Sequence, residues 1–240
     1  MLPITAAGDG LRTTLSSLLE SGTDTNPALS ALLADYTAYH RVLVVVGSVL
    51  LIAASAFAVL AWARVRRTRS PGRRWTFERR TWLAFALLGT GLALFLGLVV
   101  AANLSTVLDP RAGFADALGL LGRPRPGSSA AEVQHAVDTW LRSGSAAVPP
   151  EVSQAIDARL SWQRPKAIIT SVLLVALIAL TALVFRRLVR RSRAVRPGAR
   201  DRLLLLVGAG TTAACLLLVL MVLGNTQGSL APLSLTLFLG

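Results

Sequence analysis

The two residues best placed by type and spacing for chemistry are His135 and Asp138. They lie three positions apart in a segment with a helical pattern, and side chains at this spacing share a helix face, where they could hold a metal ion or relay a proton. Two ligands do not complete a metal site, and an exposed polar face gives the same pattern. The sequence has no phosphate-binding loop, nucleophile elbow or zinc-protease pair. We therefore expect no catalytic residue, no metal and no cofactor, with an envelope enzyme acting on a lipid or periplasmic substrate as an alternative.

The composition is that of a membrane protein. Of 240 residues, 53% are hydrophobic and 15% are charged, whereas about 25% of the residues of a typical soluble protein are charged. The single cysteine, Cys215, excludes a disulfide within the chain. The excess of arginine over lysine, 24 to one, indicates a GC-rich bacterial genome.

Four uncharged apolar stretches are long enough to cross a hydrocarbon core of about 30 Å, which needs about 20 helical residues. They are residues 42–63, 81–102, 167–185 and 203–224. Because backbone groups cannot stay unpaired in lipid, these stretches predict helices. The expected fold is an all-α integral membrane protein with four transmembrane helices.

The arginines predict the orientation of these helices. The two short loops at 64–80 and 186–202 hold 16 of the 25 basic residues and 2 of the 12 acidic ones. Since the short cytoplasmic loops of membrane proteins are enriched in basic residues, both loops are expected in the cytoplasm. The sequence therefore predicts a multi-pass protein of the cell inner (plasma) membrane with both termini extracytoplasmic.

The same arginines are candidates for contact with anionic membrane lipids or with a cytoplasmic partner, because each basic group near an anionic leaflet adds attraction. Nucleic acid is not an expected partner, since bare loops flanking a span offer no folded basic face. The residues singled out for lipid or partner contact are Arg66, Arg67, Arg69, Arg73, Arg74, Arg190, Arg191, Arg193 and Arg196.

The two halves of the chain resemble each other. Leu11, Leu15, Leu18 and Leu19 align with Val133, Val137, Trp140 and Leu141 at an offset of 122 residues, and a Ser-Gly pair follows each set. Such a repeat predicts two tandem parallel units, each with an extracytoplasmic helical hairpin before its first span. Unit one is 1–122: hairpin 9–40, span 42–63, loop 64–80, span 81–102, linker 103–122. Unit two is 123–240: hairpin 130–165, span 167–185, loop 186–202, span 203–224, apolar tail 225–240.

Both predicted hairpins end their first helix at a glycine, Gly22 or Gly144, where a left-handed helix terminus is expected. We expect the two hairpins to pack together as a small four-helix cap. The tail is nearly all apolar, and we expect it to lie in the membrane interface or to insert into a partner.

Small residues at four-residue spacing let membrane helices approach closely, and they predict where the spans pack. These residues are Gly89, Ala93, Gly97, Gly208, Gly210 and Ala214. The favoured function is a non-catalytic assembly, scaffold or accessory subunit, forming a homo-oligomer or part of a larger membrane complex. An oligomeric passive transporter or pore is an alternative.

Overall fold

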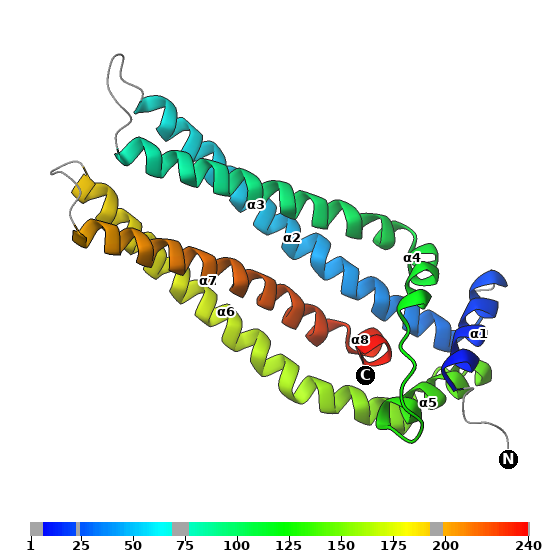
Figure 1. The fold of residues 1–240 in the computed structure, drawn as a ribbon. Coiled ribbons are helices and arrows are strands. Elements are labelled where there is room, and N and C mark those ends of the chain that lie inside the picture. The colour runs from blue at the N-terminus through cyan, green and yellow to red at the C-terminus, as the bar shows by residue number, and fades with distance from the viewer. Residues whose placement is uncertain (1–6, 23–24, 69–76, 193–198, 240) are drawn as a thin grey trace. The chain divides into compact units, whose positions relative to one another are not determined.

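The computed structural model describes residues 7–22, 25–68, 77–192 and 199–239, and every regular element in these ranges is a helix (Figure 1). Four helices are long and apolar enough to cross a membrane: α2 (Pro27–Arg67), α3 (Phe77–Leu108), α6 (Pro150–Ser192) and α7 (Ala199–Leu230). The shorter ones are α1 (Ala7–Glu20), α4 (Pro110–Ala117), α5 (Ser129–Ser143) and α8 (Pro232–Leu239), with one 3-10 turn, η2 (Leu118–Leu120). The prediction of an all-α chain with four candidate membrane helices is confirmed.

The helices of the second half follow those of the first in order and in length. Helices α1 to α4 have 14, 41, 32 and 8 residues, and helices α5 to α8 have 15, 43, 32 and 8. The lengths therefore match within two residues at each of the four positions.

Helices α2 and α6 extend well beyond the predicted spans. The sequence suggested a hairpin helix followed by a separate span, whereas each is one uninterrupted helix in the structure. Within α2 only Pro27 is a proline, and it lies at the first position, where a missing N–H costs nothing. Helix α6 also accommodates Pro165, which leaves the Ser161 carbonyl without a backbone donor but does not end the helix.

The chain divides into two compact units. The core unit comprises Met1–Val44, Ala101–Lys166 and Asn225–Gly240, and the span unit comprises Val45–Val100 and Ala167–Gly224. Each unit takes segments from both halves of the sequence. The spatial division therefore runs across the four long helices rather than between residues 122 and 123.

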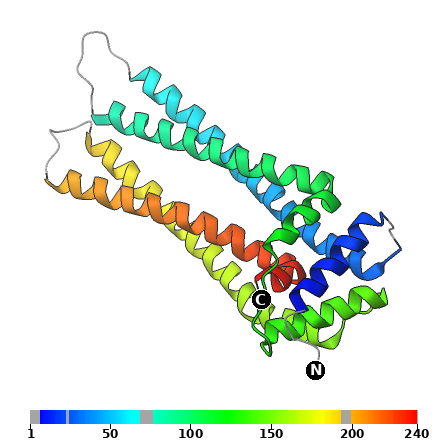
Figure 2. The same ribbon diagram turned by 45° about the vertical axis from the view of Figure 1, so that its right-hand side comes forward.

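The core unit is built around one apolar cluster. Helix α1 contributes Leu11 and Leu15, and α5 packs along α1 with Val137 and Trp140 (Figure 2). All four side chains are buried, as the amphipathic pattern of the two segments predicts. The starts of α2 and α6 add further buried residues to the cluster, namely Leu29, Leu32 and Val152.

Glycine ends both short helices that begin the two halves. The φ angle of Gly22 is +66° and that of Gly144 is +62°, so both lie in the left-handed region. The Gly144 N–H donates to the carbonyl oxygens of Trp140 and Leu141, which closes the end of α5. The predicted left-handed helix ends are confirmed, and only glycine adopts this backbone conformation without strain.

The C-terminal segment differs from what its apolar sequence suggested. Instead of presenting a free apolar tail, α8 buries Leu233 and Leu237 in the cluster of the core unit. Asp35 of α2 holds the start of α8, because its carboxylate accepts hydrogen bonds from Ser234 N (2.7 Å), Ser234 Oγ (2.7 Å) and Leu233 N (3.4 Å). A carboxylate from another helix therefore caps α8, whereas Asp109 caps α4 from its own chain position.

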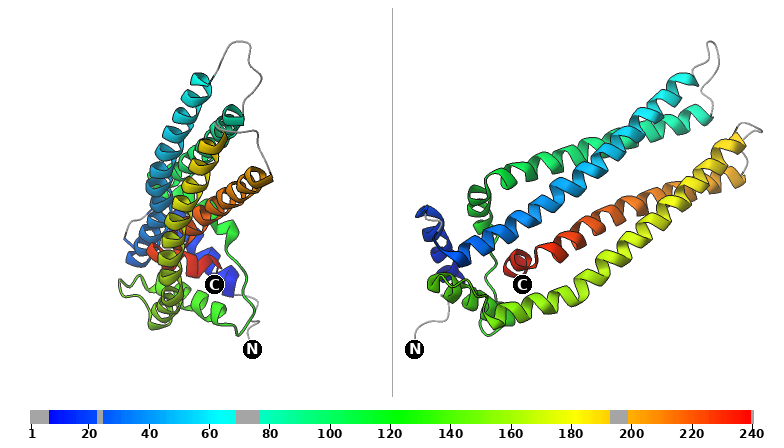
Figure 3. Two further views of the ribbon diagram at one scale, coloured as in Figure 1. Left: turned by 90° about the vertical axis from the view of Figure 1, so that its left-hand side faces the viewer. Right: turned by 180° about the vertical axis from the view of Figure 1, so that it is seen from behind.

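The span unit consists of two antiparallel helix pairs, α2 with α3 and α6 with α7 (Figure 3). Most of its apolar side chains point outward: Val49, Ile52 and Leu98 are between 63% and 71% exposed. In the most apolar 18-residue window of each long helix, only 6% to 22% of the residues are buried inside the chain. These surfaces need lipid or other membrane helices as neighbours.

Replacing Asp35 with alanine is expected to loosen α8, because three donors at its start lose their acceptor. We expect a loss of about 1–2 kcal/mol in the free energy of unfolding, the size of a helix cap. Denaturation in detergent would measure this loss, and hydrogen exchange at residues 233–237 would locate it. Asp157→Ala, an exposed aspartate on α6, is the control and should change stability by less than about 0.5 kcal/mol. Equal losses in both variants would contradict the cap.

Candidate functional site

The span unit contains a cavity of about 680 Å³ to which all four long helices contribute. This volume lies within the range of about 300–1,000 Å³ that is typical of small-molecule sites. The lining is mostly aliphatic and aromatic, and it includes Leu50, Phe57, Leu92, Ile178 and Leu216. The cavity is therefore suited to an apolar guest.

Aromatic side chains bridge the walls of the cavity. Phe85 of α3 contacts Phe57 of α2 at 5.8 Å between ring centroids and Phe185 of α6 at 4.4 Å, both in edge-to-face geometry. The Phe185 ring lies against Gly208 of α7, where an added Cβ would come within 2.8 Å of the ring. Glycine at this position lets the aromatic bridge approach the backbone of α7.

Small residues contribute to the walls unequally. Gly89 lies against the backbone and side chain of Ala58, and an added Cβ would meet both at 3.3 Å. Gly97 and Gly210 have no atom of the chain's described part within 4 Å of a built Cβ. Ala93 and Ala214 are half-buried. The small residues singled out from the sequence therefore divide into those that seat a neighbouring helix and those on open faces.

The threonine hydroxyls of the cavity wall are already satisfied by their own helices. Thr181 donates to the Leu177 carbonyl at 2.7 Å, and Thr212 donates to the Gly208 carbonyl at 2.8 Å. Thr181 Oγ1 also lies 3.7 Å from the sulfur of Cys215. Hydroxyls that bond to the i−4 carbonyl present little unmet polarity to a guest. The wall is apolar in effect over most of its length.

One end of the cavity is basic. Arg64 of α2 and Arg186 and Arg190 of α6 line it, together with Trp82 of α3. The guanidinium carbon of Arg64 lies 6.0 Å from the centre of the Trp82 ring, within cation–π distance. The indole Nε1 of Trp82 is buried and has no hydrogen-bond partner in the described part of the chain.

The arginines singled out from the sequence are not the set at the cavity. Arg190 lines it, whereas Arg66 and Arg67 are exposed and lie outside its lining. Helix α6 includes Arg191 near its end. The positions of Arg69, Arg73, Arg74, Arg193 and Arg196 lie outside the described residues.

Sequence reasoning missed Arg64 and Arg186 as cavity residues. A signal for Arg186 was present, because cavity-lining residues recur at every fourth position of α6 and form a stripe that winds around the helix. That series runs Leu174, Ile178, Ala182, Arg186 and Arg190. An apolar stripe that ends in two arginines therefore predicts a basic end to an apolar groove.

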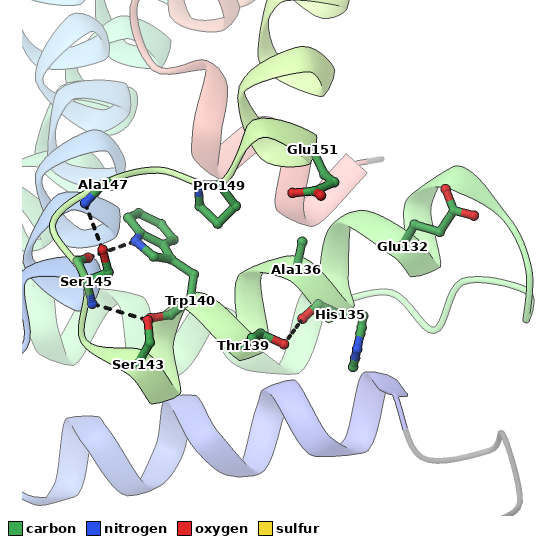
Figure 4. A pocket seen from close by; sticks show the side chains of 10 residues that line it. All are labelled: Glu132, His135, Ala136, Thr139, Trp140, Ser143, Ser145, Ala147, Pro149 and Glu151. Carbon is green, nitrogen blue, oxygen red and sulfur yellow. Dashed lines mark hydrogen bonds between the residues drawn. The ribbon is translucent and has the colours of Figure 1, made fainter.

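A second, open pocket lies on the core unit between α5 and the start of α6 (Figure 4). His135, Glu132 and Glu151 contribute polar groups to its lining, and Trp140 contributes its buried ring. Asp138 is not among the residues that line the pocket, and it forms an ion pair with Arg142 at 3.0 Å. The sequence offered His135 and Asp138 as a candidate pair without predicting a site, and the two residues do not line one pocket. No group of three metal-ligating side chains occurs among the residues that the structure describes.

A polar and aromatic cluster joins α2 to α3 inside the core unit. His40 Nδ1 lies 2.7 Å from Asn103 Oδ1, and the His40 ring contacts both Tyr36 and Tyr39 edge-on. Tyr36 donates its hydroxyl to the Gly113 carbonyl of α4 at 2.9 Å. These polar groups hold helices together.

Comparison with known proteins found no matching family model, no matching curated protein and no matching solved structure.

Replacing Gly89 with leucine is expected to disturb the packing of α3 on α2, because the new side chain would overlap Ala58. We expect a cost of about 1–3 kcal/mol, the usual size for overpacking, measured by denaturation in detergent. Gly91→Leu is the matched control: it lies on the same helix, and an added Cβ there meets no atom of the described residues within 4 Å. A stable Gly89→Leu variant would contradict the contact.

Proposed function

We propose that this chain is a non-catalytic multi-pass membrane protein that works by binding, as an assembly, scaffold or accessory subunit. The observation that carries the proposal is the cavity of the span unit, which is apolar over most of its length and basic at one end. The residues gathered there are suited to holding a guest. The neighbouring hydroxyls of Thr181 and Thr212 are engaged by helix carbonyls, which favours binding over bond-breaking chemistry.

A scaffold must hold its own helices in fixed positions, and contacts within the core unit support this role. Contacts between the two halves of the sequence tie it together. Asn26 Nδ2 donates to the Leu141 carbonyl at 2.8 Å, and Gln227 Nε2 donates to the Tyr39 carbonyl at 3.4 Å. Together with the cap that Asp35 gives α8, these bonds make each half dependent on the other.

We propose further that the two halves are tandem copies of one ancestral unit. The matching helix order and lengths support this origin, as do the left-handed glycines at the same offset of 122. Buried positions in the span unit repeat as well: Ala61 and Val65 in α2 correspond to Val184 and Leu188 in α6 at an offset of 123. A pseudo-twofold relation between two parallel units accounts for all three correspondences.

The distribution of arginine supports a plasma-membrane location with both termini and the outer hairpins extracytoplasmic. The loops at 64–80 and 186–202 then lie in the cytoplasm. The open faces at Gly97 and Gly210 are suited to lateral packing against another copy or a larger membrane complex.

Filling the cavity is the direct test of binding. Purification from native membrane in mild detergent, followed by mass spectrometry of the lipids and proteins that remain bound, should find a guest or partner on the wild-type chain. Ala182→Trp places a large ring at the cavity wall and should release most of that guest. Ala176→Trp, on the same helix outside the lining, should retain it. A wild-type chain that carries neither guest nor partner would defeat the proposed function.

The orientation is tested with single cysteines in a Cys215→Ser background. An impermeant maleimide added to intact cells should label Ala146→Cys, an exposed position between α5 and α6. Thr68→Cys, at the end of α2, should react only after the membrane is permeabilised. The reverse labelling pattern would place the arginine-rich loops outside and would overturn the topology.

A further inference from the structure

We propose that the span-unit cavity binds one membrane lipid with an anionic phosphate headgroup. Its acyl chains lie along the apolar part of the cavity and its phosphate lies at the basic end. The inference rests on the proposed function and names the guest, and three features of the cavity carry it: its length, its charge and an unsatisfied donor.

The apolar part has the length that an acyl chain requires. On α2 the lining runs from Leu50 to Arg64, 14 residues apart, which corresponds to about 21 Å along the helix axis. Half of a typical hydrocarbon core is about 15 Å thick. A lipid with its headgroup at Arg64 can therefore extend its chains along the cavity without meeting a charged side chain.

The charge of the basic end selects an anionic headgroup. Arg64, Arg186 and Arg190 bring three guanidinium groups to the cavity, and no acidic side chain occurs among its described lining residues. Guanidinium groups form paired hydrogen bonds with phosphate oxygens. A zwitterionic headgroup would bring its own cation close to these three, whereas a headgroup with net negative charge meets only attraction.

The indole of Trp82 supplies an independent sign of a missing acceptor. Its Nε1 is a donor only, it is buried, and no described group accepts from it. A buried donor without a partner is costly, and a phosphate or ester oxygen at the basic end would satisfy it. The cation–π contact holds Arg64 beside the same indole, and both residues line the cavity.

The cavity arginines can be separated from the general positive charge of the loops. Arg66 and Arg187 are close in the chain to Arg64 and Arg186 and all four are exposed, but neither Arg66 nor Arg187 lines the cavity. The double variants Arg64→Gln/Arg186→Gln and Arg66→Gln/Arg187→Gln remove the same charge from the same two loops. Only the first pair removes ligands for the proposed phosphate.

The experiment is native mass spectrometry of the full chain, titrated in detergent with phosphatidylglycerol or with phosphatidylcholine of the same acyl chains. We expect the wild type to bind one phosphatidylglycerol about tenfold or more tightly than phosphatidylcholine, the size that charge-assisted hydrogen bonds produce. The Arg64→Gln/Arg186→Gln variant should lose this preference, and the Arg66→Gln/Arg187→Gln variant should keep it. Trp82→Phe, which removes the N–H donor and keeps a smaller aromatic ring, should weaken phosphatidylglycerol binding without abolishing it.

Each alternative outcome overturns the inference in a recognisable way. Equal binding of both lipids would show that the cavity does not select the headgroup by its charge. The proposed binding function would not be contradicted by that result. Equal losses in the two double variants would assign the effect to the loops rather than to the cavity. A cavity filled by a helix of a second copy would appear as a dimer without bound lipid. Binding of no guest at all would remove the proposed function as well.

Discussion

A helix that crosses a bilayer must satisfy its backbone hydrogen bonds internally and present apolar side chains to the lipid. In the span unit this constraint leaves few means of holding helices together. Small residues and aromatic edges take that role, as Gly89 against Ala58 and Phe85 against Phe185 illustrate. The same constraint makes any polar group at membrane depth noteworthy. Arg64, Arg186 and Arg190 lie instead just beyond the apolar stretches at 42–63 and 167–185, where basic residues commonly flank a span.

The core unit is stabilised in a different way from the span unit. Its short helices bury large apolar side chains such as Leu11, Phe114 and Trp140, so burial supplies its stability. Directional bonds then fix the partners, because the Asp35 carboxylate and the Asn26 amide each satisfy the end of a helix from the other half of the sequence. A two-part protein of this kind combines a self-contained core with a span unit whose surface depends on its surroundings. That combination is suited to a subunit that binds within the membrane.

The pairing of His135 with Asp138 illustrates how far spacing can mislead. Both residues lie on α5 as the pattern indicates, yet the Asp138 carboxylate forms an ion pair with Arg142, four positions further along the helix. An i, i+4 ion pair on one helix forms locally, whereas a metal site needs further ligands from other elements. Asn103 shows a different case: its amide oxygen lies 2.7 Å from His40 Nδ1, a contact between α3 and α2 within the core unit. The second contact joins residues far apart in the chain, so only the tertiary structure shows it.

The sequence by itself determined the four apolar helices, the amphipathic faces of Leu11, Leu15 and Val137, and the left-handed ends at Gly22 and Gly144. These features follow from local periodicity and from backbone conformation, which a short stretch of residues specifies on its own. Only the tertiary structure decided that α8 is buried and capped by Asp35, and that Arg64 and Arg186 rather than Arg66 line the cavity. These outcomes depend on contacts between residues far apart in the chain, where the direction of a side chain on a helix, and not its type, decides which group it meets.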